Sequence, residues 1–220
     1  MKRSSSHSLW QHTFIMHGLW TRVDVVKDLA LDLECAMSAK FKELDAQASK
    51  LNEVEDENYR EYLSESYADD HYSYTNEWIP VIRESLLLSI CSSFEYHLGR
   101  LCDKYGETCG SNFRISDMKD RGITRCRNFL LRLGIDKAAF GDAWNRLQDI
   151  YKVRNRIAHA GSISDCSTQS AIKSETDVFE AVENKAYSIM IKENGIENVC
   201  ELMTEALRNI NRHLFEPIKN

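Results

Sequence analysis

The chain has 220 residues, of which 43% are apolar and 28% charged, so it is long and apolar enough for one domain with its own hydrophobic core and is not disordered as a whole. It contains only 9 Gly and 2 Pro, which argues against the many tight turns of a β-sandwich or β-barrel and favours helices. The formal net charge of −6 argues against binding of nucleic acid over the whole surface.

Membrane insertion and export are not expected for this chain. The longest uncharged apolar run of the helical region, residues 85–94, is far shorter than the roughly 20 residues that cross a bilayer. Lys2 and Arg3 could begin a signal peptide, but His12 and His17 interrupt the apolar segment that would have to follow. The 7 cysteines include no C-x-x-C pair and indicate free thiols in a reducing cytoplasm.

A long amphipathic helix is expected first, over residues 21–51. Its apolar residues recur every three or four positions, which is the spacing of one helix face. They are Val26, Leu29, Leu33, Met37, Phe41 and Leu44. The acidic, tyrosine-rich continuation to residue 70 is predicted to be a frayed helix end or a loop, because it is rich in Asn, Asp and Ser. Residues 1–70 are therefore treated as an acidic N-terminal helical segment.

Residues 71–220 are expected to form a helical bundle that makes one compact unit with the N-terminal segment. Thr75 or Asn76 is predicted to cap its first helix, with Pro80 in the first turn and Gly106 at the end. The apolar stripe of this helix consists of Ile82, Leu86, Ile90, Phe94, Leu98 and Leu101. That stripe predicts the central helix of the core.

The rest of the chain predicts three more helices and one insert. Ser116 is expected to open one helix, and Asp142 to cap another that ends at Gly161. Residues 162–191 suit an irregular segment with a short hairpin, and residues 193–214 return to helical spacing. The predicted fold class is all-α, an up-and-down helical bundle with a small irregular or hairpin insert.

The charge is distributed unevenly along the chain. Residues 24–70 contain 14 acidic and 5 basic residues, whereas residues 114–156 contain 11 basic and 5 acidic ones. A basic stretch of this kind either tracks a few phosphates or is a solvated helix face. Charge alone does not choose between these two interpretations.

The sequence favours neither a metal site nor a cofactor. His7, His12 and His17 are spaced by five, so successive rings lie about 140° apart on a helix and cannot all face one ion. Neither a Gly-rich phosphate loop nor a G-x-S-x-G elbow occurs in the chain. We therefore expect no metal and no cofactor.

The most distinctive polar residues lie in a cationic helix end, residues 151–161. Asn155 and His159 are four positions apart on one helix face, where the amide could orient the imidazole. Arg154 lies about 140° from His159 on an ideal helix. A site made of both requires the helix to open near residues 160–161, or a second copy of the chain to supply its own Arg and His. Dimerisation is the simpler solution.

This segment resembles the R-x4-6-H signature of the higher eukaryotes and prokaryotes nucleotide-binding (HEPN) superfamily, with Arg154-Asn155 followed by His159. The order of elements from about residue 76 to the C-terminus resembles that superfamily more weakly. HEPN domains are small α-helical bundles, and many are metal-independent endoribonucleases whose paired signatures face each other across a dimer. The resemblance thus implies a homodimer of HEPN type that cleaves RNA, as a defence or toxin-type RNase.

Cleavage of RNA by its own 2′-hydroxyl would give each polar residue of the segment a role. His159 would accept the proton of that hydroxyl, because histidine exchanges protons near neutral pH. Arg154 would neutralise the charge that develops on phosphorus, and Asn155 would hold the imidazole. Lys152 and Arg156 would bind the flanking phosphates.

Three questions about these residues stay open in the sequence. Glu95, the one acid within the central apolar stripe, is either a buried partner of Arg154 or Arg156 or an edge residue that faces water. The cations of the motif either form a site or simply complement the dipole at a helix C-terminus. A second stretch, residues 208–213 with Arg208 and His213, also matches the signature, but its acidic neighbours favour the first one.

Two other functions are compatible with the same motif. One is a catalytically silent scaffold that binds RNA or protein. The other is the toxin half of a toxin–antitoxin pair, with an antitoxin or regulatory protein as partner. In that branch of the superfamily the motif often continues as His-x-Tyr, from which His159-Ala160-Gly161 departs.

Overall fold

The computed structural model describes residues 5–161, 166–184 and 186–215. Across these ranges it contains seven α-helices and a two-stranded antiparallel sheet, which confirms the predicted all-α class. The helices are α1 (Ser5–Ser49), α2 (Glu57–Ser73), α3 (Ile79–Thr108), α4 (Gly122–Arg132), α5 (Asp142–Ala160), α6 (Cys166–Ser174) and α7 (Gly195–Phe215), and the strands are β1 (Phe179–Asn184) and β2 (Ala186–Ile191). None of the helices in the described ranges is both long and apolar enough to cross a membrane.

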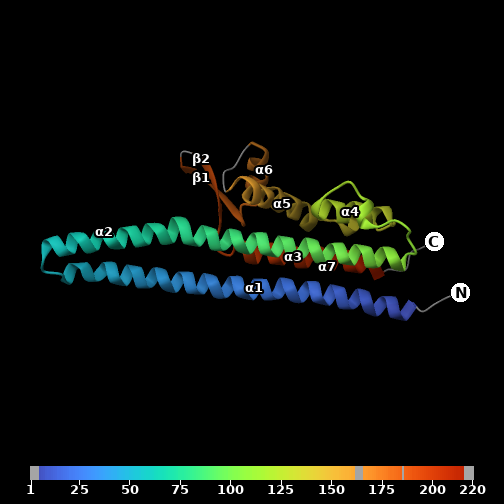
Figure 1. Ribbon diagram of the computed structural model, residues 1–220, viewed down its shortest axis with the longest axis horizontal. Helices are drawn as coiled ribbons and strands as arrows, with labels where there is room; N and C mark the ends of the chain where they lie inside the picture. The colour runs from blue at the N-terminus through green and yellow to red at the C-terminus, as the bar shows by residue number, and fades with distance from the viewer. Residues whose placement is uncertain (1–4, 162–165, 185, 216–220) are drawn as a thin grey trace.

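The molecule is elongated because its first three helices are long and lie side by side. Figure 1 shows α1 running antiparallel to α2 and α3, with α4 to α7 gathered around α3. The end formed by α2 and the adjoining part of α1 projects beyond the other helices. This arrangement separates a helical hairpin from the bundle that contains α5.

A seven-residue repeat in α1 holds this helix against its neighbours. Its buried residues include Met16, Val23, Ala30, Met37 and Leu44, each at most 5% exposed. Such spacing is typical of helices that pack along one seam, as in a coiled coil. The prediction that Leu29 belongs to the apolar stripe was wrong, because it is 47% exposed beside that seam.

The segment predicted to be a frayed end or a loop contains a second helix. After a 3-10 turn, Lys50–Glu53, the side chain of Asp56 accepts a hydrogen bond from the backbone N–H of Tyr59 at 3.0 Å and caps α2. The polar residues that suggested a loop instead cover a helix with no buried residue. The acidic segment therefore contains the end of α1, the turn and most of α2, which together form a helical hairpin.

The predicted helix start at Thr75 or Asn76 was also wrong. Both side chains donate backwards, Thr75 to the carbonyl of His71 at 2.7 Å and Asn76 to that of Tyr72 at 2.9 Å. Side chains that bond to the preceding turn leave the helix uninterrupted. A π-helical turn, Tyr74–Trp78, joins α2 to α3, so the expected boundary between residues 70 and 71 falls inside one continuous rod.

The helix expected to open at Ser116 begins later. Residues Ile115–Asp117 form only a 3-10 turn, and α4 starts at Gly122, whose φ of +60° suits glycine. The helix expected from Asp142 is present as α5, and Gly161 with a φ of +67° ends it as predicted.

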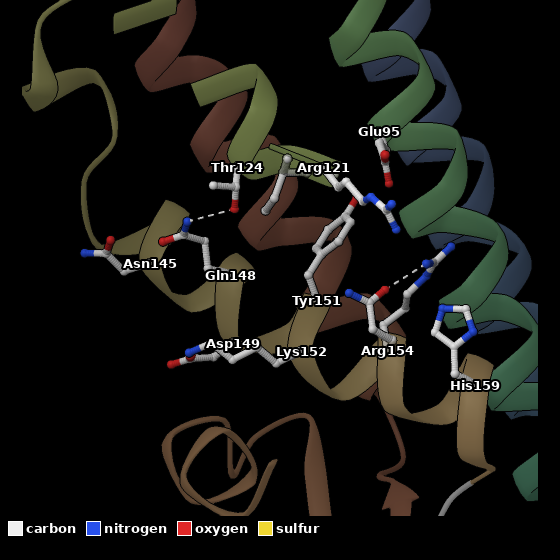
Figure 2. A pocket seen from close by; sticks show the side chains of 13 residues that line it. Glu95, Arg121, Thr124, Asn145, Gln148, Asp149, Tyr151, Lys152, Arg154 and His159 are labelled. Carbon is white, nitrogen blue, oxygen red and sulfur yellow. Dashed lines mark hydrogen bonds and ion pairs between the residues drawn. The ribbon is translucent and has the colours of Figure 1, made fainter. Parts of the chain in front are cut away.

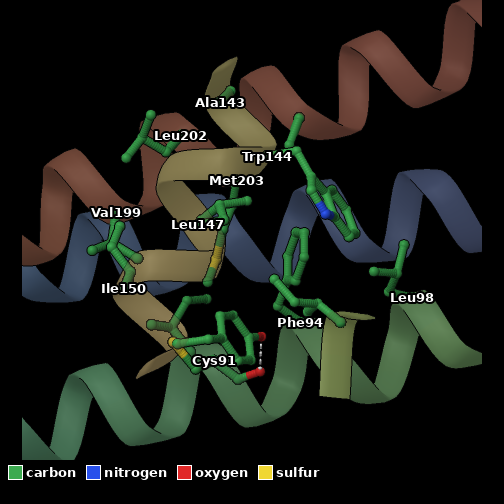
Figure 3. Close-up of a cluster of buried hydrophobic side chains, with 14 of the residues drawn as sticks. Cys91, Phe94, Leu98, Ala143, Trp144, Leu147, Ile150, Val199, Leu202 and Met203 are labelled. Carbon is green, nitrogen blue, oxygen red and sulfur yellow. Dashed lines mark hydrogen bonds between the residues drawn. The ribbon is translucent and has the colours of Figure 1, made fainter. Parts of the chain in front are cut away.

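The main core lies where α5 crosses between α3 and α7 (Figure 3). Phe94 and Leu98 of α3 meet Trp144 and Leu147 of α5 there, and all four are at most 1% exposed. Burying a side chain of this size stabilises a fold by roughly 1.5–3 kcal/mol. The hydroxyl of Tyr151 donates to the carbonyl of Cys91 at 2.6 Å and ties α5 to α3.

The predicted hairpin within residues 162–191 is confirmed by β1 and β2, which pair antiparallel. The same region also contains α6, where an irregular segment was expected, because the buried side chains of Ala171 and Ile172 give it an apolar face. Residues 162–165 lie outside the described ranges. Arg146 of α5 anchors this insert through ion pairs of 2.8 Å with both Glu175 and Asp177.

Candidate functional site

A cleft of about 630 Å³ lies along α5, between that helix, the start of α4 and one residue of α3 (Figure 2). Its volume is in the range of small-molecule and cofactor sites. Five of the six predicted site residues line it, namely Glu95, Lys152, Arg154, Asn155 and His159. The cleft therefore gathers most of the residues that the sequence singled out.

The periodicity of α5 explains why these residues share one cleft. Asn145, Gln148, Lys152, Asn155 and His159 recur every three or four positions and so occupy one face of the helix. The opposite face carries the buried apolar residues of the core. The segment is an amphipathic helix with a polar face directed at the cleft.

Arg154 is held in place by two different elements. Its Nη2 donates to the hydroxyl of Ser92 on α3 at 2.6 Å, and its Nη1 donates to Oδ1 of Asn155 at 3.0 Å. Its Nε is buried and has no hydrogen-bond partner within the described residues. No ion pair joins its guanidinium to a carboxylate in that part of the chain, so a full positive charge faces the cleft.

His159 lies in the last turn of α5, where its side chain is exposed and lines the same cleft as Arg154. The expected separation of 140° does not keep the two residues apart. The helix stays intact to Ala160, and the long side chain of Arg154 reaches Ser92, which brings both residues to one cleft in a single chain. Neither an opened helix nor a second copy is needed to bring them together.

The position of Asn155 differs from the prediction. Its amide oxygen accepts from Arg154, and no hydrogen bond connects it with His159 among the described residues. The neighbouring guanidinium is the stronger donor, because it is charged. Asn155 therefore orients Arg154 instead of the imidazole.

The other predicted residues take three different positions. Lys152 lines the cleft and its ammonium donates to Asp149 at 2.5 Å. Arg156 is not among the residues that line the cleft, because two positions along a helix turn it about 200° from Arg154. The prediction that Arg156 binds a phosphate next to Arg154 therefore does not fit its position.

Glu95 lines the cleft, but it forms no ion pair with Arg154 in the described ranges. Its carboxylate instead lies beside Gly122, where an added Cβ would come within 3.8 Å of Oε2. Gly122 begins α4, and the N-terminus of a helix attracts negative charge. The carboxylate of Glu95 thus lies at the start of a helix that forms one wall of the cleft.

Sequence reasoning did not identify several residues of this site. Gln148 and Asn145 lie about two and three turns before Asn155 on the polar face of α5, so extending the helical spacing from Asn155 would have found them. Ser92 and Arg121 come from other elements, and no local pattern indicates that they meet α5.

The second match to the signature does not bring its own Arg and His together in this way. Arg208 lines a separate cavity of about 360 Å³ with His17, Trp20 and Asp24 of α1. His213 does not line that cavity, and its Nδ1 lies 2.9 Å from the carbonyl of Asn209. Geometry therefore favours the motif on α5.

No group of three or more His, Cys, Asp or Glu with a metal-binding arrangement occurs among the described residues. His17 is exposed on α1, whereas the side chains of His7 and His12 lie outside the described part of the structure. Comparison with known proteins finds no matching family model, no matching curated protein and no matching solved structure. The functional interpretation therefore depends on the chemistry of the cleft.

Proposed function

We propose that this chain is a metal-independent endoribonuclease of HEPN type, which cleaves RNA through attack of a ribose 2′-hydroxyl on the adjacent phosphate. The observation that carries the proposal is the presence of Arg154 and His159 in one cleft of a single chain. A fixed cation and a proton acceptor are the two groups that this reaction needs from a protein.

His159 takes the proton from the 2′-hydroxyl as the oxygen attacks phosphorus. Arg154 donates its N–H groups to the phosphoryl oxygens, where negative charge increases in the transition state. The P–O5′ bond breaks, and the departing 5′-oxygen takes a proton from water. The products are a 2′,3′-cyclic phosphate and a 5′-hydroxyl, and the nucleophile is supplied by the substrate itself.

The surroundings of Arg154 suit a phosphate. Arg121 and Lys152 also line the cleft, so its lining includes three cations. Of the two acids that line it, Asp149 is bonded to Lys152 and Glu95 lies beside the start of α4. Cations that face an anionic substrate strengthen both binding and transition-state stabilisation.

We also propose that the chain acts as a homodimer through the exposed face of α3. Exposed, uncharged residues recur every three or four positions along this face and the end of the π-helical turn before it: Trp78, Val81, Ser85, Ser89, Ser92 and Tyr96. Aromatic residues at both ends and small residues between them favour close packing of two helices. Because Ser92 binds Arg154, a partner on this face would lie next to the cleft.

A catalytically silent RNA-binding or protein-binding scaffold is the second candidate. It is favoured by one observation: Asn155 binds Arg154, which leaves the exposed imidazole of His159 without an orienting hydrogen bond in the described residues. Growth distinguishes the two, because an active RNase of toxin type arrests cells on expression whereas its His159→Ala variant does not. Equal growth of both strains supports the scaffold.

The deciding experiment is end-group analysis of RNA incubated with purified protein in excess EDTA. We expect 2′,3′-cyclic phosphate and 5′-hydroxyl ends, lost in His159→Ala and in Arg154→Ala. The matched control is His213→Ala, which should cleave normally. Cleavage that requires Mg²⁺, that leaves 3′-hydroxyl ends or that survives both substitutions contradicts the proposal. DNA should stay intact because it has no 2′-hydroxyl.

A further inference from the structure

The cleft continues from Arg154 toward the N-terminus of α5, and different side chains line it there. Asn145 lies nine residues before Arg154, which is about 13 Å along a helix axis. Arg121 and Arg154 line the half near His159. The far half contains the uncharged polar side chains of Thr124, Asn145 and Gln148, beside the ion pair of Lys152 with Asp149 (Figure 2). The two halves therefore suit two different chemical groups of one ligand.

The polar groups of the far half are only partly used within the protein. Nε2 of Gln148 donates to Oγ1 of Thr124 at 3.5 Å, which is a long and weak hydrogen bond. Within the described residues the amide oxygen of Gln148 and the whole amide of Asn145 form no hydrogen bond. Both donors and acceptors thus remain for a ligand.

The floor of the cleft is apolar and rigid. Ile123 and Tyr151 line the cleft and are at most 6% exposed. The hydroxyl of Tyr151 is engaged by the carbonyl of Cys91, so its ring has a fixed orientation. A flat apolar ligand with a polar edge would contact this floor with its face and the amides with its edge.

We propose that this half of the cleft, which we call the amide subsite (Thr124, Asn145 and Gln148), binds an unpaired nucleobase next to the scissile phosphate. The inference rests on the proposed RNase function and adds sequence preference to it. A primary amide presents a donor and an acceptor side by side, as does the Watson–Crick edge of an unpaired base. A phosphate would instead seek the cations near Arg154.

The test compares cleavage of a short single-stranded RNA library that is randomised around one position. Gln148→Glu replaces the amide donor by a carboxylate, and Thr124→Val removes the hydroxyl at almost constant volume. We expect either substitution to reduce the discrimination between bases about tenfold while the end groups stay the same. Asn52→Asp, a matched change in the exposed 3-10 turn far from the cleft, should leave the preference unchanged.

An unchanged cleavage pattern in both variants would overturn the amide subsite and leave the proposed RNase intact. If the native protein cleaves no RNA, the RNase proposal fails. The amide subsite is then tested separately by the binding of four oligoribonucleotides that carry A, C, G or U at one position. Affinity that depends on the base and loses this dependence in Gln148→Glu supports it. Equal affinity for all four, or no binding, overturns it. Matching melting temperatures confirm that the variants fold.

Discussion

Arg154 is the residue on which the proposed chemistry depends most, and its position is set by two short contacts. Ser92 fixes one end of the guanidinium from α3, and Asn155 fixes another from α5. A planar, permanently charged group held in this way meets a phosphate without losing side-chain freedom at that moment. Ser92 and Asn155 are thus positioning residues for Arg154.

We predict that Arg154→Lys lowers the rate of RNA cleavage about 100-fold, because an ammonium cannot replace the two-pronged guanidinium. Ser92→Ala should lower it about tenfold, with kcat affected more than KM. The double variant should lose no more than Arg154→Lys alone, since Ser92 acts through Arg154. Single-turnover cleavage measures all three, and additive losses would show that Ser92 acts independently.

Tyr151 provides a second prediction at the scale of one residue. Removing its hydroxyl in Tyr151→Phe deletes the hydrogen bond that ties α5 to the carbonyl of Cys91 in α3, so the free energy of unfolding should fall by about 0.5–1.5 kcal/mol. Tyr62→Phe is the control, because Tyr62 is 65% exposed and should change stability by less than about 0.5 kcal/mol. Urea titrations of both variants provide the comparison.

The same residue predicts a pH dependence. Burial raises the pKa of Tyr151 well above its usual value of 10, so the unfolded chain releases this proton first as the pH rises past 10. The folded state then binds more protons than the unfolded state, and stability falls with increasing pH. Stability measured from pH 9 to 11 should decline more steeply for the native protein than for Tyr151→Phe. Equal slopes would contradict this.

At the scale of elements, the exposed face of α3 consists of uncharged residues, whereas the insert is held by an ion pair. The α3 face carries no charge at its six exposed positions from Trp78 to Tyr96, which suits contact with another helix. The insert is attached to α5 by Arg146, which pairs with a Glu175 side chain that is 1% exposed. The α3 face is therefore uncharged and exposed, whereas the contact that holds the insert includes a buried carboxylate.

We predict that Ser89→Arg, in the centre of the α3 face, converts a dimer to a monomer, because it places an unpaired charge within a helix seam. Light scattering at micromolar concentration measures the change. Ser64→Arg, an equally exposed substitution on α2, should leave the dimer intact. A native protein that is strictly monomeric at that concentration would remove the dimer from the proposed function.

For the insert, Glu175→Ala should lower the free energy of unfolding by about 2 kcal/mol, because it removes the buried partner of Arg146 while the ion pair with Asp177 remains. Protease cleavage should also increase around the β1–β2 hairpin. Glu43→Ala, which breaks an exposed pair with Lys40, should cost less than about 1 kcal/mol. Similar losses in the two variants would show that the buried pair does not anchor the insert.

At the scale of the whole molecule, one bundle around α3 contains the cleft, and the end formed by α2 and the adjoining part of α1 projects from it. The exposure of the cysteines follows this organisation. Cys91 and Cys200 lie in the bundle core, where burial raises the pKa of each thiol to about 12, whereas Cys35 on α1 and Cys109 after α3 are exposed. Reactivity of the thiols should therefore follow the fold.

We predict that iodoacetamide at pH 8 modifies Cys35 and Cys109 in the native protein and spares Cys91 and Cys200 until urea unfolds the chain. Mass spectrometry of peptides identifies the modified positions. Labelling of Cys91 under native conditions would mean that the contact of α5 with α3 opens readily, which contradicts the packing in Figure 3.

The sequence by itself determined the features that depend on a few neighbouring residues. Helical periodicity predicted α1 from residue 21 onward, although that helix begins at Ser5, and it predicted α3, α5 and α7. Gly161 predicted the end of α5, because a positive φ is a local requirement. The motif of Arg154 and His159 was found from residues close together in the chain, and the predicted site residues make up five of the 13 that line the cleft. These features need no knowledge of which elements meet.

Only the tertiary structure decided which partner each polar group takes. Asn155 binds Arg154 instead of His159, and Ser92 reaches Arg154 from 62 positions away in the chain. In each case several partners are equally available to the isolated sequence. Packing of α3 against α5 selects one of them, because a hydrogen bond requires a distance and an angle that local spacing does not specify.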